Sequence, residues 1–255
     1  MGVLFTKEGH VATITLNRPE QLNALDPDSW KEFHEILRSA KVDPEIRVLI
    51  LTGAGEKAFC TGSDLKKSMP PATNFASTYF EEENLLAPME MWKPIICAIN
   101  GFAIGGGLEM ALACDIRIAS EKASFGLAEV KVGSLPGLGG TQRLIRFIPK
   151  AIAMRMLLTA DRITAAEAYR VGLISDIVPA DKLMETAKAI AEKIASNAPL
   201  SVKAAKMAVV VGGDLPVKQA SQMEYLLWGI LRDTEDRIEG RVAFAEKRPP
   251  VYKGR

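Results

Sequence analysis

The stretch that decides the fold runs from Asn100 to Glu109 and reads Asn-Gly-Phe-Ala-Ile-Gly-Gly-Gly-Leu-Glu. It follows the apolar run Ile95–Ile99 and leads into an expected helix over Leu108–Ala113. Glycines at such a junction let a ligand approach the main chain, and the unpaired N–H groups of a helix start stabilise negative charge. The same glycines would also allow the helix to pack tightly against a sheet. Glu109 favours a site, because a carboxylate in so apolar a helix is costly to bury without a partner or a role.

Two further stretches contain candidate site residues. The turn Phe59–Leu65 follows the apolar run Val48–Leu51, so it presents backbone N–H groups at the carboxyl end of a strand, where ligands bind in α/β sheets. In the stretch Ala123–Gly133, Glu129 has apolar residues on its N-terminal side. Glu109 and Glu129 would form a pair of partly desolvated carboxylates. Such a pair can divide acid and base roles, because burial and mutual repulsion keep one of them protonated.

The rest of the chain alternates short apolar runs with helical patterns. The runs suit strands buried on both faces and predict a largely parallel sheet with helical crossovers; they are Val11–Leu16, Val48–Leu51, Ile95–Ile99, Ile116–Ala119 and Leu173–Val178. Asp26-Pro27 is typical of a helix N-cap followed by proline, so a first helix is expected there. The last third is predicted to be helical over Asp181–Ala195, Ser201–Val210, Leu215–Leu231 and Glu235–Glu246. The pattern predicts an α/β fold.

Composition excludes several classes of protein. The 255 residues include 32 Lys+Arg and 31 Asp+Glu, a net charge of +1, so no global basic field would attract nucleic acid or an anionic membrane. The three cysteines form no CxxC pair, which argues against a disulfide framework or a zinc site and for a reducing compartment. The start of the chain lacks the basic and apolar regions of a signal peptide. We therefore expect a cytoplasmic protein without a metal, a nucleic-acid partner or a membrane.

Two other enzyme classes fit poorly. The segment Gly53–Ala58 matches the relaxed dinucleotide pattern GxGxxA. That pattern requires an acidic residue about 20 positions on, at the end of a second strand, where this sequence has Pro70-Pro71. A nucleophilic triad is also disfavoured, because His10 and His34 are the only histidines and no GxSxG motif is present.

In order along the chain, the motifs resemble those of the enoyl-CoA hydratase (crotonase) family. The similar stretches are Ile14–Pro19, Leu22–Leu25, Phe59–Leu65, Asn100–Glu109, Pro136–Leu144 and Ala243–Arg248. Each is weak alone, and the whole set in order is specific. The resemblance implies a crotonase-type spiral of ββα units over residues 1–195. It also implies a C-terminal helical region, residues 196–255, through which trimers or dimers of trimers (hexamers) assemble.

The resemblance also implies the roles of individual residues. Family members bind acyl-CoA thioesters and hold the thioester oxygen with two backbone N–H groups, which by position belong to Ser63 and Gly106. The two glutamates of the hydratases match Glu109 and Glu129, 20 positions apart. Contacts with CoA or the acyl group are implied for Gln21, Leu22, Ala24, Gly62, Asp64, Leu65, Gly105, Phe244 and Lys247. No separate cofactor is implied, since coenzyme A is part of the substrate.

The implied reaction is syn addition of water to a 2-enoyl-CoA thioester, or the reverse elimination. Glu109 would deprotonate the water and Glu129 would supply or relay the proton to C2. Other activities within the resemblance are double-bond isomerisation, dienoyl-CoA hydration and carnitinyl-CoA dehydration, and some relatives bind RNA. The paired acids favour hydration or dehydration, and the mixed charges of the first helix speak against RNA.

Several features depart from the family or carry no prediction. Ser63 stands where alanine is common, and Ala128 stands where proline is common. The segment 66–92, with the helix around Trp228, is expected to shape the acyl pocket. The sequence predicts neither the acyl group, nor the physiological direction and pathway, nor the choice between trimer and hexamer.

Overall fold

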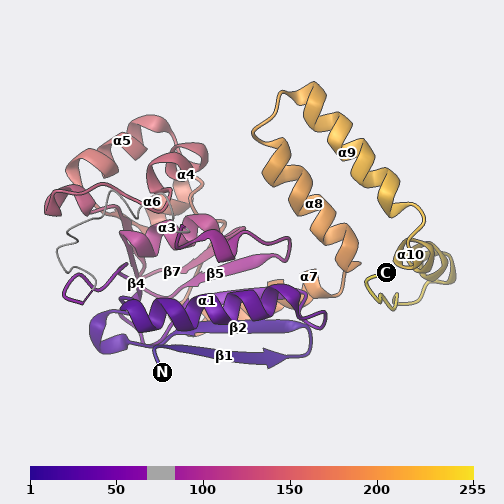
Figure 1. Cartoon of the computed structure of the whole chain (residues 1–255), viewed down its shortest axis with the longest axis horizontal. Coiled ribbons are helices and arrows are strands. Elements are labelled where there is room, and N and C mark those ends of the chain that lie inside the picture. Colours follow the sequence, from indigo (N-terminus) through magenta and orange to yellow (C-terminus); the bar gives the residue numbers. More distant parts are fainter. Residues whose placement is uncertain (68–83) are drawn as a thin grey trace, which may run out of the picture.

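The computed structural model describes residues 1–67 and 84–255, so most of the expected acyl-pocket segment 66–92 lies outside the described residues. A six-stranded sheet in the order β1-β2-β3-β5-β7-β10 forms its body (Figure 1). Its strands are β1 (Val3–Glu8), β2 (Val11–Leu16), β3 (Val48–Gly53), β5 (Ile95–Ile99), β7 (Ile116–Ser120) and β10 (Asp176–Val178). Only β1 and β2 pair antiparallel; every other neighbouring pair is parallel, as predicted.

A second sheet, in the order β4-β6-β8-β9, stands beside the first. Its strands are β4 (Ala58–Cys60), β6 (Phe102–Ile104), β8 (Ser124–Gly126) and β9 (Ile163–Thr164). Three of them directly follow a strand of the large sheet, since β4 comes after β3, β6 after β5 and β8 after β7. Each turn of the chain thus contributes one strand to each sheet, and this is the ββα repeat that the sequence resemblance implies.

Strand β3 shows why the central runs are apolar without interruption. Leu49 and Leu51 face the larger core, whereas Val48 and Ile50 face a second cluster built on helix α7 (Leu183–Ala195). Successive side chains of a strand point to opposite faces, so a strand covered on both sides has no solvent-facing position. Burial on both faces therefore fixes these strands in the middle of the molecule.

The helices surround the two sheets and extend beyond them. They are α1 (Pro27–Val42), α3 (Gly106–Ala113), α4 (Gly140–Phe147), α5 (Lys150–Thr159), α6 (Ala165–Arg170), α7, α8 (Pro199–Gly212), α9 (Val217–Leu231) and α10 (Glu235–Glu246). The predicted N-cap of α1 forms, because the Asp26 carboxylate accepts the Ser29 N–H at 3.0 Å. Helix α3 begins at Gly106, two residues earlier than the predicted Leu108. The last strand is shorter than predicted, because Leu173 donates its N–H to Ala168 and closes helix α6 instead.

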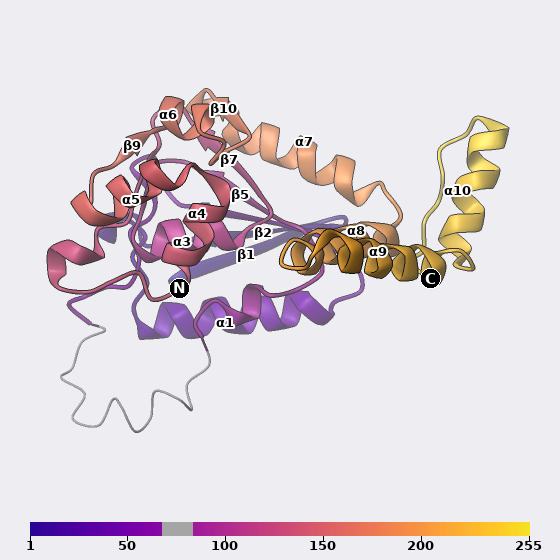
Figure 2. The same ribbon diagram turned by 90° about the horizontal axis from the view of Figure 1, so that it is seen from above.

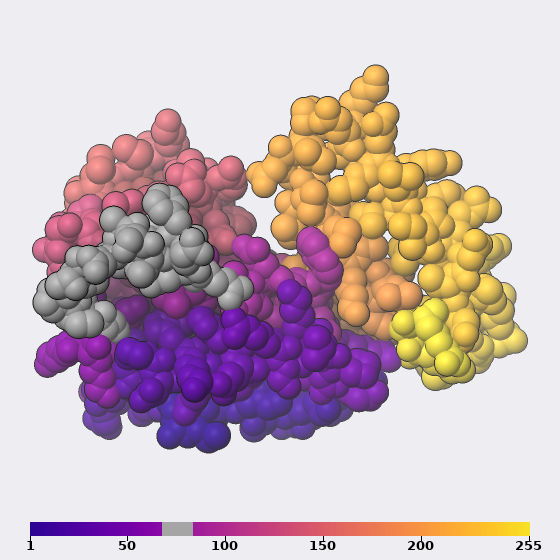
Figure 3. All heavy atoms as spheres, viewed as in Figure 1, coloured from indigo at the N-terminus to yellow at the C-terminus, as the bar shows by residue number. Residues whose placement is uncertain are grey.

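Helices α8, α9 and α10 lie to one side of the sheets, with α10 farthest from them (Figure 2). The surface is hollowed between α8–α9 and the lobe that contains α4 and α5 (Figure 3). Several large apolar side chains on α8 and α9 are exposed; they include Val209, Tyr225, Leu226 and Ile230. No helix in residues 1–67 or 84–255 is long and apolar enough to cross a membrane.

Candidate active site

The start of helix α3 and the turn after β4 meet closely through their backbones. A Cβ on Gly62 would lie 3.0 Å from the Gly106 nitrogen, and a Cβ on Gly106 would lie 3.3 Å from the Gly62 Cα. Gly62 has a φ of +90° and Gly105 a φ of +56°, the left-handed region that only glycine enters without strain. Glycine is therefore needed here both for the turn and for the close approach.

The Ser63 N–H points toward this junction because of how its strand is paired. The Leu25 N–H donates to the Gly62 carbonyl, and the Asp64 N–H donates to the Leu25 carbonyl, each at 2.8 Å. Backbone groups alternate in direction along an extended strand, so the N–H of Ser63 faces away from Leu25. A Cβ on Gly106 would lie 3.9 Å from the Ser63 nitrogen, which places the two residues side by side.

Two unpaired N–H groups result from this arrangement. Gly106 is the first residue of α3, and the first N–H groups of a helix have no intrahelical acceptor. Across residues 1–67 and 84–255, no acceptor takes the N–H of Ser63 or of Gly106. Two neighbouring free donors at a helix start can stabilise an oxygen on which negative charge develops.

Glu109 lies one turn further along α3 and is only 2% exposed. Its Oε1 accepts the backbone N–H groups of Leu138 and Gly140, both at 2.7 Å. Burial raises the pKa of Glu109 above its ordinary value, while these two N–H groups and the charge of Arg143 lower it. No group in the described part of the chain donates to Oε2. The carboxylate is thus held by one oxygen and free to exchange a proton through the other.

Glu129 is the first residue of the short 3₁₀ segment η4 (Glu129–Val132). Its Oε2 is shielded from solvent and has no hydrogen-bond partner among the described residues, and a Cβ on Gly105 would lie 3.2 Å from its Oε1. Burial raises the pKa of Glu129; its own N–H lowers that pKa and the negative charge of Glu109 raises it further. A carboxyl with a raised pKa and an unpaired oxygen holds its proton more readily than an exposed glutamate and is suited to transferring it.

The remaining predicted site residues fall into three groups. Gln21, Leu22 and Ala24 lie in the loop that Leu25 joins to the Gly62–Asp64 strand. Leu65 is exposed beside that strand, whereas the carboxylate of Asp64 is paired with Arg18. Phe244 and Lys247 lie on or directly after α10, and Trp228 lies on α9, which Figures 1 and 2 both draw apart from α3. A single chain therefore brings together the glycines, Ser63 and the two glutamates, but not these C-terminal residues.

Sequence reasoning missed the segment that holds Glu109. The run Pro136–Leu144 entered the sequence analysis only as a stretch similar to the family, yet its N–H groups at Leu138 and Gly140 bind the carboxylate. Arg143 fixes this loop, since its Nη1 donates to the Leu138 carbonyl at 2.7 Å. The available signal was the pair Gly139-Gly140 directly before a helix, because unpaired N–H groups at a helix start favour an anion.

Neither the cysteines nor a metal-binding cluster adds further chemistry to the described part of this site. Cys60, Cys97 and Cys114 are buried and free, and burial raises the pKa of the Cys60 thiol to about 12. Reactive cysteines have low pKa values, so Cys60 acts as an apolar core residue. No group of three or more His, Cys, Asp or Glu side chains in the described ranges is placed to hold a metal ion.

Comparison with known proteins places this chain in a family. The family model described as enoyl-CoA hydratase/isomerase matches residues 6–255. The (E)-benzylidenesuccinyl-CoA hydratase of Thauera aromatica is 57% identical over 255 residues, covering 100% of both chains. The short-chain-enoyl-CoA hydratase of Clostridium acetobutylicum is 43% identical, covering 96% of this chain and 95% of that one. The crystal structure of an enoyl-CoA hydratase from Bacillus anthracis superposes with a TM-score of 0.94 at 42% identity, covering 100% of both chains.

Proposed function

Because the chain belongs to the enoyl-CoA hydratase/isomerase family, we propose that it adds water across the double bond of a 2-enoyl-CoA thioester, or removes it in reverse. The observation that carries this proposal is the meeting of the buried Glu109 and the partly buried Glu129 with the N–H groups of Ser63 and Gly106, which are free among the described residues. Coenzyme A enters as part of the substrate, and the steps below use only groups of the chain.

The N–H groups of Ser63 and Gly106 hold the thioester oxygen. When water attacks C3, the electrons of the double bond move toward the carbonyl and the oxygen becomes enolate-like. Donors already in place stabilise that charge without reorganisation, and one such donor contributes about 10²–10³ in rate. The free state of both N–H groups supports this role.

The two glutamates divide the proton transfers. Glu109 takes a proton from water while the hydroxide oxygen bonds to C3, and Glu129 supplies a proton to C2. Release of the proton from Glu109 and reprotonation of Glu129 restore both groups, so one water is added in total. Each acid or base group contributes about 10²–10⁴ in rate. The fixed Oε1 of Glu109 supports its role as base, because a carboxylate held by two N–H groups keeps a single orientation.

The coenzyme A moiety is held by the loop of Gln21, Leu22 and Ala24, with Gly62, Gly105 and Leu65 around the thioester. Phe244 and Lys247 reach it from a neighbouring copy of the chain. The exposure of Phe244 (86%) and the separation of its helix α10 from α3 in the single chain support this arrangement (Figure 2). Self-association as a trimer or hexamer is supported by the exposed apolar side chains of α8 and α9, since such surface is favourably buried between copies.

The substrate panel begins with the relatives' substrates. The 57% identity with the Thauera enzyme makes (E)-benzylidenesuccinyl-CoA the first thioester to test. Crotonyl-CoA, a short-chain enoyl thioester, is the second. Hydration removes the conjugation of the enoyl thioester, so its ultraviolet absorbance falls as the reaction proceeds. Loss of that absorbance with at least one of the two thioesters is the expected result.

Glu109→Gln and Glu129→Gln test the assigned roles. Each substitution keeps the side-chain volume and removes one acid or base, so kcat should fall by about 10² or more. Glu121→Gln is the matched control, because Glu121 is exposed on the loop after β7. Turnover near that of the wild type in either active-site variant would contradict the proposed mechanism.

A further inference from the structure

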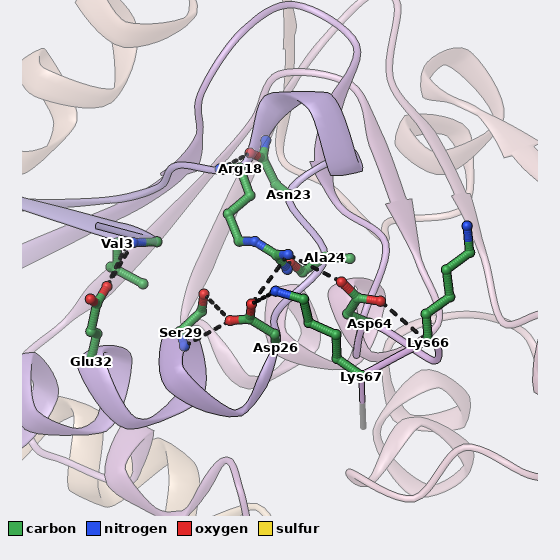
Figure 4. A network of polar contacts seen from close by, with 11 residues as sticks. Val3, Arg18, Asn23, Ala24, Asp26, Ser29, Glu32, Asp64, Lys66 and Lys67 are labelled. Atoms are coloured by element: carbon green, nitrogen blue, oxygen red, sulfur yellow. Dashed lines mark hydrogen bonds and ion pairs between the residues drawn. The ribbon is translucent and has the colours of Figure 1, made fainter. Parts of the chain in front are cut away.

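Arg18 lies in the turn after β2, and its side chain is only 12% exposed. Figure 4 shows its guanidinium between three acceptors. One nitrogen, Nη1, donates to the Ala24 carbonyl, and the other, Nη2, lies 3.1 Å from Asp64 Oδ2 and 3.2 Å from Asp26 Oδ2. A planar guanidinium can donate to all of these acceptors at once because its N–H groups point in fixed directions. The ammonium of lysine is a compact charge without such fixed directions.

These contacts bracket the bridge that orients Ser63. Ala24 directly precedes Leu25, and Asp64 directly follows Ser63, so Arg18 holds one residue on each side of the Leu25–Ser63 pair. The two backbone hydrogen bonds of that pair turn the Ser63 N–H toward Gly106. A shift of Ala24 relative to Asp64 would therefore change the direction of that N–H.

The ion pairs that surround Arg18 depend on one another. Asp26 and Asp64 both approach the same nitrogen, and Asp26 also receives Lys67 Nζ at 2.8 Å and caps helix α1. Among the described residues the Lys67 ammonium pairs with Asp26 and not with Asp64, so without Arg18 the carboxylate of Asp64 would lose this cation and the two carboxylates would repel. Removing one partner of a shielded ionic network leaves an uncompensated charge that the backbone must move to solvate.

We propose that Arg18 is a positioning residue for the reaction: by joining the Ala24 carbonyl to the Asp64 carboxylate, it aims the Ser63 N–H at the thioester oxygen. This inference rests on the proposed function, in which Ser63 is one of two donors to that oxygen. It also links the loop of residues 21–24 to the donor, so contact of coenzyme A with that loop and polarisation of the carbonyl occur on one rigid unit.

Three variants separate the two contacts of Arg18, with the Ala24 carbonyl and with the Asp64 carboxylate. Arg18→Gln releases both Ala24 and Asp64, so it should lower kcat by about ten- to hundredfold and raise KM, since misplacing a group by about 1 Å can cost about 10²-fold in rate. Asp64→Asn weakens only the side of the donor and should lower kcat with KM nearly unchanged. Arg18→Lys keeps the charge and should recover part of the lost kcat.

The decisive measurement is the infrared C=O stretch of bound butyryl-CoA, labelled with carbon-13 at its thioester carbonyl. This probe has no double bond to hydrate, so its signal is independent of turnover. Two N–H donors lower the stretch in the wild type, and in Arg18→Gln and Asp64→Asn it should move back toward its value in water. Arg155→Gln removes an arginine of an exposed ion pair on α5 as a control, because its side chain is 76% exposed.

The outcomes distinguish this inference from the proposed function. If the wild type hydrates no enoyl thioester, the proposed function fails, while the C=O stretch still reports whether Arg18 orients Ser63. If the wild type is active but Arg18→Gln and Asp64→Asn keep its kcat and its C=O stretch, the positioning role is wrong. Should Arg18→Gln not fold, Asp64→Asn decides alone, with the thermal midpoint of each variant measured beside its activity.

Discussion

Replacing Gly107 by alanine tests how closely helix α3 must approach strand β4. Gly107 is buried in the first turn of α3, next to Gly106. A Cβ at this position would lie 2.1 Å from the Cys60 carbonyl oxygen and 2.6 Å from its carbonyl carbon. Both are backbone atoms of a buried strand and cannot rotate away, so the helix itself must move.

The required movement follows from these distances. Contacts of real Cβ atoms essentially never fall below 3.0 Å, so the helix must withdraw by about 0.9 Å from the 2.1 Å contact to reach even that limit. Gly106 moves with it and away from Ser63, and a displacement near 1 Å costs about 10²-fold in rate. Forcing an extra methyl into a packed core also destabilises the fold by about 1–3 kcal/mol. We therefore expect kcat/KM to fall by about 10² in a protein that still folds.

Steady-state hydration kinetics and urea unfolding test this prediction together. Gly229→Ala is the control, because it adds the same methyl to helix α9, where no heavy atom of the described residues outside the adjoining helix backbone lies within 4 Å. Alanine is favoured over glycine in a helix by about 0.8–1.0 kcal/mol, so this variant should be active and at least as stable as the wild type. If Gly107→Ala retained kcat/KM within about threefold of the wild type, the close approach of α3 to β4 would not be what sets the donor geometry.

Three further predictions concern charge, capping and assembly. Burial raises the pKa of Glu129 above 4.5, so the folded state binds the proton more tightly and the stability of the wild type falls as pH rises through the folded pKa. In calorimetry, Glu129→Gln should therefore melt at a higher temperature than the wild type near pH 8, and the difference should vanish near pH 4. A difference that stays the same across this pH range would contradict the assignment. Asp26→Ala removes the N-cap of α1 and two ion pairs and should cost about 0.5–2 kcal/mol or more in urea unfolding, whereas a loss near zero would mean that the cap contributes nothing. Leu226→Glu places a charge on the exposed apolar face of α9 and should lower the mass found by sedimentation, and an unchanged mass would exclude this face from the interface.

The large sheet could be predicted because its strands are buried on both faces. The runs at Val48–Leu51 and Ile95–Ile99 contain only apolar residues, and burial on both sides is what produces such a pattern in parallel strands. The small sheet could not be predicted in the same way. Its strands, such as Ala58–Cys60 and Phe102–Ile104, have three residues or fewer, too few for a periodic pattern to be distinguished from a turn.

Some residues of the candidate site could likewise be predicted from the sequence, and others could not. Glu109 stood out because a lone carboxylate in an apolar helix needs a reason, and the glycines before it indicated a backbone site. Its partners at Leu138 and Gly140 left only a weak signal, the glycine pair before α4, since they bind through N–H groups that every residue type except proline possesses. Arg18 was overlooked for another reason. Its acceptor Asp64 lies 46 positions further along the chain and meets it only through the pairing of Leu25 with Ser63.

Because the proposed donors are backbone N–H groups, the space around each donor residue predicts whether it tolerates a substitution. At Ser63 the donor is the backbone N–H, so the side chain is free to differ from the alanine common in the family without loss of the donor. At Gly106 the donor is likewise the N–H, but a Cβ would lie 3.3 Å from the Gly62 Cα and 3.6 Å from a Leu138 methyl carbon. Ser63 and Gly106 have the same proposed role but therefore differ in their tolerance of substitution. Ser63 already carries a side chain, whereas Gly106 packs against Gly62 and against Leu138, which belongs to the segment that holds Glu109.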